Sequence, residues 1–388
     1  MNLKRIEKLQ ALLCESNLDG MLYGPGGDMQ YFLDVPGNYW QRTRDTGQGR
    51  TEAERVHNGS FAKHPDRMLY IPAQGEPSLI IVYHHIEEMR GCGVKLIPSH
   101  YQLFEGALGE VIGAAKRIAV GKSCDASLEK KLKLVNSGIE VVEGERYGEK
   151  LRLIKDAGEI AKLQAVASFT DKAMGIVAKA LVPGATPRDI QLLIARIAVE
   201  GGCEDIAFTP GVLMVQNGAP DSEIMFSHPH DRPMQENTAI GFDYGFVLDG
   251  YCSDYGRSFY CGKNADIKAA YKALTEAQLT LFDKIKPGEP MSMCNDVIQA
   301  YLNKTPFKDY LRKNPQNLQG HQIGIEQHER PWLRDDEDEA VFLPGMVMCV
   351  EPKIWWPGKC YLRCEDMIVI TETGCRALTQ YDRDHFEL

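Results

Sequence analysis

Residues 238–259 read TAIGFDYGFVLDGYCSDYGRSF and predict a β-hairpin. The apolar and aromatic runs suit strands, and Asp249-Gly250 is a preferred residue pair for a two-residue hairpin turn. If this turn sets the register, position 243 lies opposite position 256, and position 254 lies opposite position 245. Because side chains alternate across a strand, Asp243 and Asp254 are then diagonal neighbours on one face of the sheet.

Two carboxylates inside an apolar hairpin need a physical reason. Like charges held close together cannot both stay ionised, and a divalent cation between them removes the conflict. This segment alone leaves two alternatives open. Asp254 caps a turn while Asp243 pairs with a base such as Arg257, or the register slips by one residue and separates the two acids.

Residues 346–370 repeat the pattern in the sequence MVMCVEPKIWWPGKCYLRCEDMIVI. A turn centred on Gly358 places Glu351 directly across from Glu365. The flanking residues are Val, Ile, Met and Cys rather than Lys and Ser, so these strands are predicted to be buried. A second pair of acids inside apolar strands is hard to explain as solvated surface and favours the cation.

Residues 321–329 read HQIGIEQHE and supply a histidine, in a segment that Gly324 interrupts too strongly for a predicted helix. Four carboxylates and one imidazole suit a pair of Mn²⁺, Co²⁺, Zn²⁺ or Fe²⁺ ions better than a closed zinc site, which prefers sulfur and nitrogen. Cys360 and Cys364 lack zinc-ribbon spacing and are interpreted as reduced strand residues. The candidate metal ligands are Asp243, Asp254, His321, Glu351 and Glu365.

The chain has 388 residues, which predicts two domains of mixed α and β structure, because a single hydrophobic core seldom grows this large. The N-terminal part predicts a first helix and then short strands at residues 20–23, 67–71, 78–83, 94–97 and 118–120. From about Arg152 the pattern changes to long helices around residues 159–167 and 187–195, which the Val182-Pro183-Gly184 break separates. We therefore place the domains at residues 1–151 and 152–388.

Composition excludes several classes of protein. The net charge of −10 and the absence of a Lys/Arg cluster argue against nucleic-acid binding, and no apolar stretch is long enough for a membrane span. The N-terminus resembles a folded helix rather than a signal peptide, and an odd number of cysteines, 11, favours the reducing cytoplasm. The polar segment 36–65 is either a lid over a binding site or a surface insertion.

The three segments resemble the Xaa-Pro peptidases, namely prolidase and aminopeptidase P, whose catalytic domain has the pita-bread fold. The family's first motif, Asp-x-Gly followed by Gly-Tyr-x-Ser-Asp, is matched by Asp243, Gly245, Gly250, Tyr251, Ser253 and Asp254. Its histidine motif is matched by His321, Gly324, His328 and Glu329. Its last two motifs are matched by Glu351, Pro352, Arg363, Glu365 and Asp366.

The resemblance implies an α+β protein with a C-terminal pita-bread domain and a smaller α/β domain of the creatinase type at the N-terminus. It also implies two divalent ions, with Mn²⁺ preferred, a bridging water acidified to hydroxide, and Glu351 as the proton shuttle. His328 would contact the substrate, and Arg363 and Asp366 would orient the ligands. A further catalytic histidine is best matched by His228, with His230 as the other candidate. Family members commonly form homodimers.

This sequence departs from the family pattern at two places. Gln322 stands where a glycine is common, and Trp332 stands near the expected arginine that receives a dipeptide's carboxylate, with Arg330 and Arg334 on either side. We predict a metallopeptidase that cleaves Xaa-Pro bonds in small peptides. The alternative is a non-peptidase on this fold that acts on a small amino-acid-like compound, such as a dimethylsulfoniopropionate lyase or an ectoine- or creatine-type hydrolase.

Overall fold

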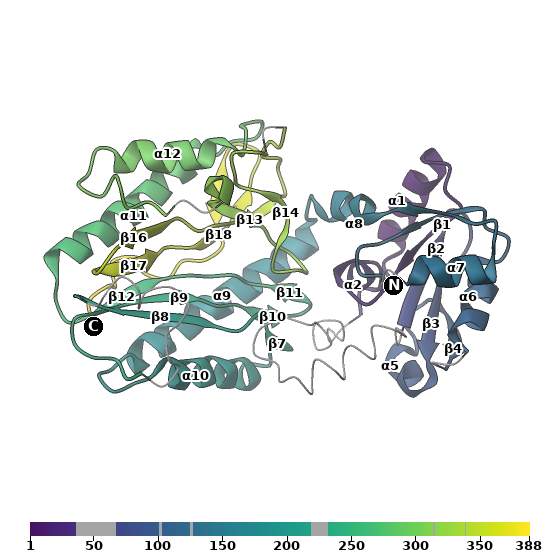
Figure 1. Ribbon diagram of the computed structural model, residues 1–388, viewed down its shortest axis with the longest axis horizontal. Helices are drawn as coiled ribbons and strands as arrows, with labels where there is room; N and C mark the ends of the chain where they lie inside the picture. The colour runs from purple at the N-terminus through teal and green to yellow at the C-terminus, as the bar shows by residue number, and fades with distance from the viewer. Residues whose placement is uncertain (36–66, 101–102, 125–126, 219–231, 313–314, 338) are drawn as a thin grey trace. The chain divides into compact units, whose positions relative to one another are not determined.

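A computed structural model describes residues 1–388 except 36–66, 101–102, 125–126, 219–231, 313–314 and 338. The chain divides into two compact units, Met1–Leu153 and Ile154–Leu388, which are coloured purple to blue and teal to yellow in Figure 1. Segment 36–65, interpreted as a lid or an insertion, lies outside the described residues. None of the described helices combines the length and the hydropathy of a membrane span.

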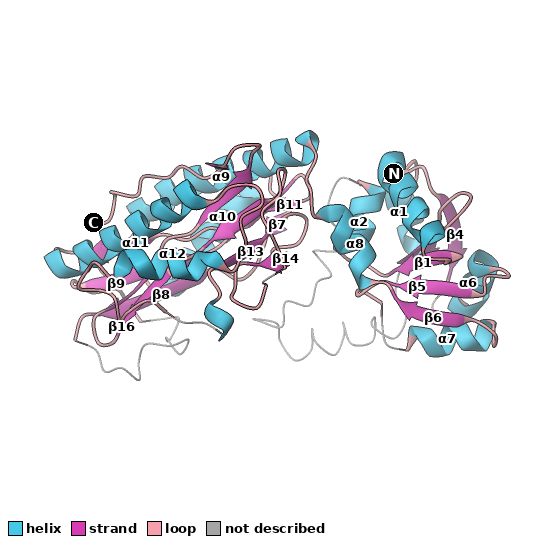
Figure 2. Ribbon diagram, turned by 90° about the horizontal axis from the view of Figure 1, so that it is seen from above, coloured by secondary structure: helices cyan, strands magenta, loops and turns pink. Residues whose placement is uncertain are grey.

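The N-terminal unit is built on one mixed sheet with helices on both faces (Figure 2). Its strand order is β4-β3-β2-β1-β5-β6, and β1 pairs antiparallel with β2 and parallel with β5. Leu22 of the central strand β1 packs toward helices α6 and α7. Its neighbour Tyr23 points to the opposite face, where its ring lies 5.1 Å from the ring of Phe32 in α2. Burial on both faces explains why β1 is apolar throughout.

The first helix and the five strands predicted in this unit are present, the strands within one or two residues of their expected bounds. Strand β6 and helices α2, α5, α6, α7 and α8 were not predicted. Strand β6 is at an edge of the sheet and only partly buried, so its sequence carries a weak pattern. The helices are α1 Leu3–Glu15, α2 Gly27–Leu33, α5 Ile86–Met89, α6 Phe104–Ile112, α7 Leu128–Val135 and α8 Glu145–Arg152. The strands are β1 Gly20–Tyr23, β2 Arg67–Pro72, β3 Ser78–Val82, β4 Lys95–Ser99, β5 Arg117–Val120 and β6 Glu140–Glu143.

The C-terminal unit combines small antiparallel sheets with long helices. A five-stranded sheet has the order β14-β13-β15-β18-β19, and a three-stranded sheet has the order β12-β9-β8. The helices are α9 Ala157–Ala180, α10 Pro187–Glu200, α11 Ala265–Lys284 and α12 Met293–Leu302. The strands are β7 Asp205–Ile206, β8 Gly211–Gln216, β9 Thr238–Asp243, β10 Phe246–Leu248, β11 Tyr251–Cys252, β12 Ser258–Cys261, β13 Gly320–Gln322, β14 Glu329–Trp332, β15 Val347–Val350, β16 Lys353–Trp356, β17 Cys360–Arg363, β18 Asp366–Ile370 and β19 Cys375–Ala377.

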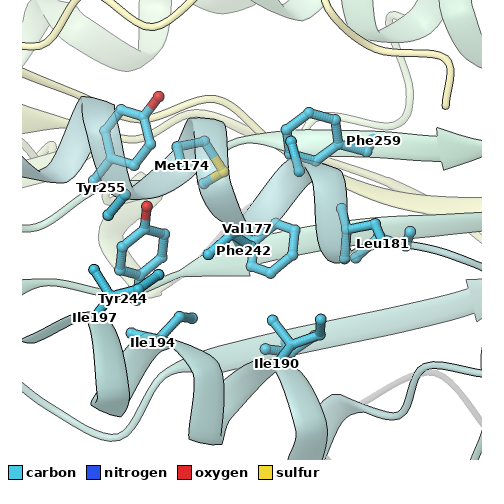
Figure 3. Packing of buried hydrophobic residues seen from close by; sticks show 14 of the residues in the cluster. Met174, Val177, Leu181, Ile190, Ile194, Ile197, Phe242, Tyr244, Tyr255 and Phe259 are labelled. Carbon is cyan, nitrogen blue, oxygen red and sulfur yellow. The ribbon is translucent and has the colours of Figure 1, made fainter. Parts of the chain in front are cut away.

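Helices α9 and α10 form where the apolar spacing predicts them, and side chains at their N-termini define their starts. Asp156 and Thr186 each accept a hydrogen bond from the backbone of the third helical residue, and Glu159 and Asp189 return the bond in a capping box. Figure 3 shows aliphatic side chains of both helices packed against aromatic rings of the β9–β12 region. This core supports one side of the first acidic hairpin.

The first hairpin has the register that the sequence predicts. Gly241 pairs with Ser258 in β9–β12, and Val247 pairs with Cys252 in β10–β11, so a single register runs through the hairpin and sets position 243 opposite 256. The turn residues Asp249 and Gly250 have φ values of 50° and 83°. Both values are positive, which suits an Asp-Gly pair in a tight hairpin turn.

The second hairpin also keeps one register along its length. Lys353 pairs with Arg363 in β16–β17, and Val350 pairs with Asp366 in β15–β18. Both pairings place Glu351 opposite Glu365, as the turn around Gly358 predicts. The backbone N–H of Glu365 donates to the carbonyl oxygen of Gly256 at 2.9 Å. This bond joins the second hairpin to the first and brings the two pairs of acids together.

Gly245 lies between the two aspartates of the first hairpin, and a Cβ there would lie 1.8 Å from the carbonyl oxygen of Ser253. We expect Gly245→Ala to push the strands apart and to lower the free energy of unfolding by about 1–3 kcal/mol. Urea unfolding followed by tryptophan fluorescence measures this, because Trp332, Trp355 and Trp356 lie in the C-terminal unit.

The matched control is Gly175→Ala in helix α9, where the nearest atom to a new Cβ would be 3.9 Å away. Alanine favours a helix over glycine by about 1 kcal/mol, so this variant should be as stable as the wild type or more stable. Equal stability of the two variants would show that the hairpin has room for a side chain at position 245.

Candidate metal centre and active site

Four of the five candidate ligands lie at or near strand ends, and the fifth, His321, lies within a strand. Asp243 ends β9, and Asp254 follows β11 in the first hairpin. His321 is in the middle of β13, Glu351 follows β15 and Glu365 precedes β18. Strand β15 lies between β13 and β18 in one sheet. His321 and Glu365, which are more than forty positions apart in the sequence, are therefore brought to the same part of this sheet.

The tightest part of this group is formed by Asp254, His321, Glu365 and Cys349, which each offer a ligand atom within 4.8 Å of the others. The imidazole Nε2 of His321 lies 3.5 Å from Oδ2 of Asp254. Its Nδ1 lies 3.1 Å from the carbonyl oxygen of Gln322. A proton on Nδ1 satisfies that contact and leaves the Nε2 lone pair facing the acids, as in a metal-binding histidine.

Burial sets the protonation of this group. Burial, together with the charge of Asp243, raises the pKa of Asp254 well above its ordinary value. Burial likewise raises the pKa of Glu365, although Arg363 opposes the shift. Burial lowers the pKa of His321, so its imidazole is neutral at neutral pH. Full ionisation of these acids is therefore unfavourable without a cation, and a bound cation would favour their ionised forms.

Three oxygens in the group fit a bound cation. Oδ1 of Asp243, Oδ1 of Asp254 and Oε1 of Glu365 are buried and have no hydrogen-bond partner among the described residues. A buried carboxylate oxygen without a partner costs free energy, and native proteins normally satisfy such atoms. Carboxylate oxygens beside a neutral imidazole form a typical donor set for divalent transition metals. The residues present therefore fit the ions that the sequence predicts.

Arg363 connects the carboxylates. Its guanidinium donates to Asp243, to Oε2 of Glu351 at 2.6 Å and to Oε2 of Glu365 at 2.9 Å. Lys353 donates to the same oxygen of Glu351. Although burial raises the pKa of Glu351, Lys353 and Arg363 outweigh burial, so this pKa lies well below its ordinary value. Glu351 is thus ionised and held from two sides.

Asp366 lies on the other face of β18 from Glu365. Its carboxylate accepts hydrogen bonds from Arg257 at 2.6 Å, from Thr379 at 2.7 Å and from Arg383 at 2.6 Å. Arg257 also donates to the carbonyl oxygen of Glu365 at 2.6 Å. Asp366 therefore supports the ligand strand from behind, whereas Arg363 contacts the carboxylates directly. Arg257 pairs with Asp366 and not with Asp243, against the first alternative weighed for the hairpin.

His328 and Trp332 border the group on the side of β14. The ring of His328 lies 4.3 Å from that of His321 and 5.4 Å from that of Trp332. Burial of the imidazole and the neighbouring His321 lower the pKa of His328 to about 3, although its side chain remains open to solvent on one side. His328 is therefore neutral at neutral pH. The histidines His228 and His230 lie outside the described residues.

The two arginines beside Trp332 differ in their surroundings. Arg330 is exposed, and Arg334 is bound by Asp336 at 2.6 Å and by Glu337 at 3.5 Å. Gln322, at the expected glycine position, is buried and donates to the carbonyl oxygen of Arg330 at 2.8 Å. Gln322 therefore links β13 to β14.

Glu329, which follows His328 in the sequence, is buried rather than exposed to substrate. Its carboxylate accepts a hydrogen bond from the ammonium of Lys155 at 3.0 Å and one from the backbone N–H of Glu326 at 3.3 Å. Gly324 lies against the same carboxylate, and a Cβ there would approach it to 2.7 Å. Glu329 thus fixes the loop that presents His328.

Two residues of the group, Cys349 and Lys353, were not predicted from the sequence. Both lie two positions from Glu351, so side-chain alternation along the strands places them on its face of the sheet. That signal was available in the sequence. Their significance depends on His321 and Arg363, which reach this face from other strands.

Comparisons with known proteins give one family. The model of metallopeptidase family M24 matches residues 161–372. A protein described as the putative dipeptidase YkvY of Bacillus subtilis is 30% identical over 290 residues, which are 73% of this chain and 76% of that protein. The probable dipeptidase PepE of Mycobacterium tuberculosis is 26% identical over 390 residues, covering 96% of this chain and 92% of the relative.

Solved structures agree with this result at the level of the fold. The Xaa-Pro dipeptidase from Bacillus anthracis superimposes with a TM-score of 0.81 at 22% identity, over 100% of this chain and 99% of the other. This likeness confirms the predicted α+β class with a C-terminal pita-bread fold.

Asp254 tests whether the buried group binds metal. In the metal-free protein its burial and the charge of Asp243 are unfavourable, so Asp254→Ala should keep the melting temperature of the metal-free protein or raise it. We expect the variant to lose about half or more of the bound metal, and with it the rise in melting temperature that Mn²⁺ gives the wild type. Elemental analysis and thermal unfolding measure the two effects.

Asp249→Asn is the matched control, because this acid is in the turn of the same hairpin and its side chain is 59% exposed. Asparagine tolerates the positive φ of that position, so metal content should be unchanged. Wild-type metal content and an intact Mn²⁺ response in Asp254→Ala would contradict the assignment of Asp254 as a ligand.

Proposed function

This chain belongs to metallopeptidase family M24, and from that membership we propose that it hydrolyses Xaa-Pro bonds in small peptides with two divalent metal ions. The observation that carries the proposal is the set of buried carboxylate oxygens without hydrogen-bond partners beside the neutral His321. We assign the ions to Asp243, Asp254, His321, Glu351 and Glu365.

Manganese is the ion we expect, with Co²⁺, Zn²⁺ or Fe²⁺ as alternatives, because four carboxylates and one imidazole form a largely hard donor set. When bound, the ions would supply a water molecule acidified to near-neutral pKa and a Lewis acid for the scissile carbonyl. The protein's contribution is to hold the carboxylates in place, and Arg363 does this through its hydrogen bonds to Asp243, Glu351 and Glu365.

Glu351 is the residue we propose as the proton shuttle. Lys353 and Arg363 keep its carboxylate ionised, so that it can accept the proton of the attacking water and pass it to the leaving nitrogen. Neutral His328 can donate a hydrogen bond to the carbonyl oxygen as negative charge develops there. Among the histidines outside the described residues, we prefer His228 for a second catalytic role and assign His230 to substrate binding.

The surroundings of this group support a small peptide as the substrate. His328 and Trp332 form an aromatic wall on one side, where apolar side chains can pack. Arg330, at the exposed edge of the same strand, is a further candidate for substrate contact. The relatives are described as dipeptidases, which supports a peptide substrate. From the resemblance to prolidase and aminopeptidase P we propose a homodimer, and we propose the cytoplasm as its location.

A substrate panel tests the proposal. Metal-loaded enzyme is incubated with Xaa-Pro dipeptides, longer Xaa-Pro peptides, dipeptides without proline and dimethylsulfoniopropionate, and products are measured by mass spectrometry and headspace analysis. We expect release of the N-terminal residue from Xaa-Pro substrates with Mn²⁺. Release of dimethyl sulfide without Xaa-Pro cleavage would reject the peptidase and support the lyase alternative.

Glu351→Gln tests the proton shuttle. Glutamine keeps the size of the side chain and can still accept hydrogen bonds from Arg363, but it cannot take up the proton. We expect kcat to fall by about 10²–10⁴-fold, the usual contribution of a positioned general base. The substrate KM should change far less, and residual metal content is measured in the same samples so that the rate is expressed per loaded site.

A further inference from the structure

We propose that the ammonium group of Lys353 binds the C-terminal carboxylate of the substrate and thereby makes the enzyme selective for dipeptides over longer or amidated peptides. This inference rests on the proposed peptidase function and deepens it. Trp332 stands near the position where an arginine is expected to receive this carboxylate. Lys353 would supply the missing positive charge.

Lys353 is placed beside the proposed metal ligands by the second hairpin. It begins β16 and pairs directly with Arg363 of β17, so the two side chains lie on the same face. Alternation along the strand puts Glu351 on that face as well. The Lys353 side chain is only 7% exposed, and its ammonium contacts Oε2 of Glu351. A buried positive charge therefore lies next to the residue that we propose as the proton shuttle.

The ammonium of Lys353 has donors left for an anionic ligand. An ammonium group has three donors. Among the described residues, Glu351 is the single side chain to which the ammonium of Lys353 donates. Arg363, in contrast, is bound to three carboxylates at once. Of Arg363 and Lys353, Lys353 is therefore the one with unused donors.

The charges of the site favour an anion at this position. Asp243, Asp254, Glu351 and Glu365 carry four negative charges when ionised, which two divalent ions would balance. His321 is neutral. Arg363 and Lys353 then leave the site with an excess of positive charge, which a substrate carboxylate would reduce. A peptide amide, which has no charge, would not.

The two arginines near Trp332 are weaker candidates. The charge of Arg334 is already paired with Asp336 and Glu337. Arg330 is exposed at the edge of β14, where water screens its attraction for a carboxylate. A buried ammonium binds a carboxylate more strongly than an exposed guanidinium does, because water competes less.

The hairpin beyond Lys353 supports a short substrate. Trp355 and Tyr361 come next on the same face, and they pack with Val215 and Leu213 of β8. Arg312 donates to the hydroxyl of Tyr361 at 3.3 Å. These bulky side chains fill space next to the ammonium, which disfavours residues that continue past a carboxylate bound there.

The test compares Lys353→Met with the wild type on a dipeptide and on the same dipeptide as its C-terminal amide. Because Lys353 also contacts Glu351, turnover of both substrates should fall, and the test is the ratio of kcat/KM for the free acid to kcat/KM for the amide. Loss of a charge-assisted hydrogen bond to the carboxylate should lower this ratio by about 10- to 100-fold. Lys353→Arg, which keeps the charge, should recover part of the preference for the acid.

Equilibrium binding gives a second readout that does not depend on turnover. A reduced-bond dipeptide, which cannot be hydrolysed, and its amide are titrated into each metal-loaded variant by calorimetry. The affinity for the acid should fall in Lys353→Met and the affinity for the amide should not. Metal content is measured alongside, because a loss of metal would lower both affinities together.

Lys359→Met is the matched control, since this lysine is exposed in the turn of the same hairpin. It should behave as the wild type with both ligands. Equal losses for acid and amide in Lys353→Met would overturn the proposal and make Lys353 a charge partner of Glu351 only. If Lys353→Met does not fold, Lys353→Gln is judged by the same criterion. Failure of the wild type on every peptide would instead reject the proposed function.

Discussion

The site depends on the confinement of several carboxylates in a space where water cannot solvate them. Arg363 bridges Asp243, Glu351 and Glu365, yet burial still raises the pKa of Glu365 and of Asp254. One guanidinium is thus not enough to neutralise the group. The surrounding protein is stable enough to carry this unfavourable arrangement because two hairpins and a helical core hold the strands that bear it. Such stored electrostatic cost is a common property of sites that bind cations.

Local sequence predicted the part of the site that local structure creates. Each pair of acids lies within one hairpin, and a single turn fixes the register of that hairpin, so Asp243 could be placed near Asp254 and Glu351 opposite Glu365. Helices α9 and α10 were predictable for a similar reason, because their apolar spacing and capping residues are read within one segment.

The order of the strands in the sheets could not be predicted from the residues. This order decides which residues from distant parts of the sequence meet at the site. His321 reaches the acids because β13 pairs with β15, and the sequence gives no local sign of that pairing. The hydrogen bond between the backbones of Glu365 and Gly256, which joins the two hairpins, likewise has no local sign in the sequence. Cys349 and Lys353 were visible by alternation, but their importance appears only once Arg363 and His321 are in place. The sequence thus offered His321 as the imidazole ligand, and the resemblance to a known family agreed, but no residue pattern showed how its strand reaches the acids.

The salt bridge between Lys155 and Glu329 has a consequence for how the catalytic half can be isolated. Lys155 is the second residue after the boundary at Leu153, and its ammonium lies 3.0 Å from the carboxylate that fixes the His328 loop. Its backbone N–H also donates to the carbonyl oxygen of Gly345, ahead of β15. A truncated protein that starts at the first residue of helix α9 would therefore lack a residue that braces the aromatic wall. Residues 154–156 are therefore part of the catalytic unit, and a fragment of that unit should begin at or before residue 154.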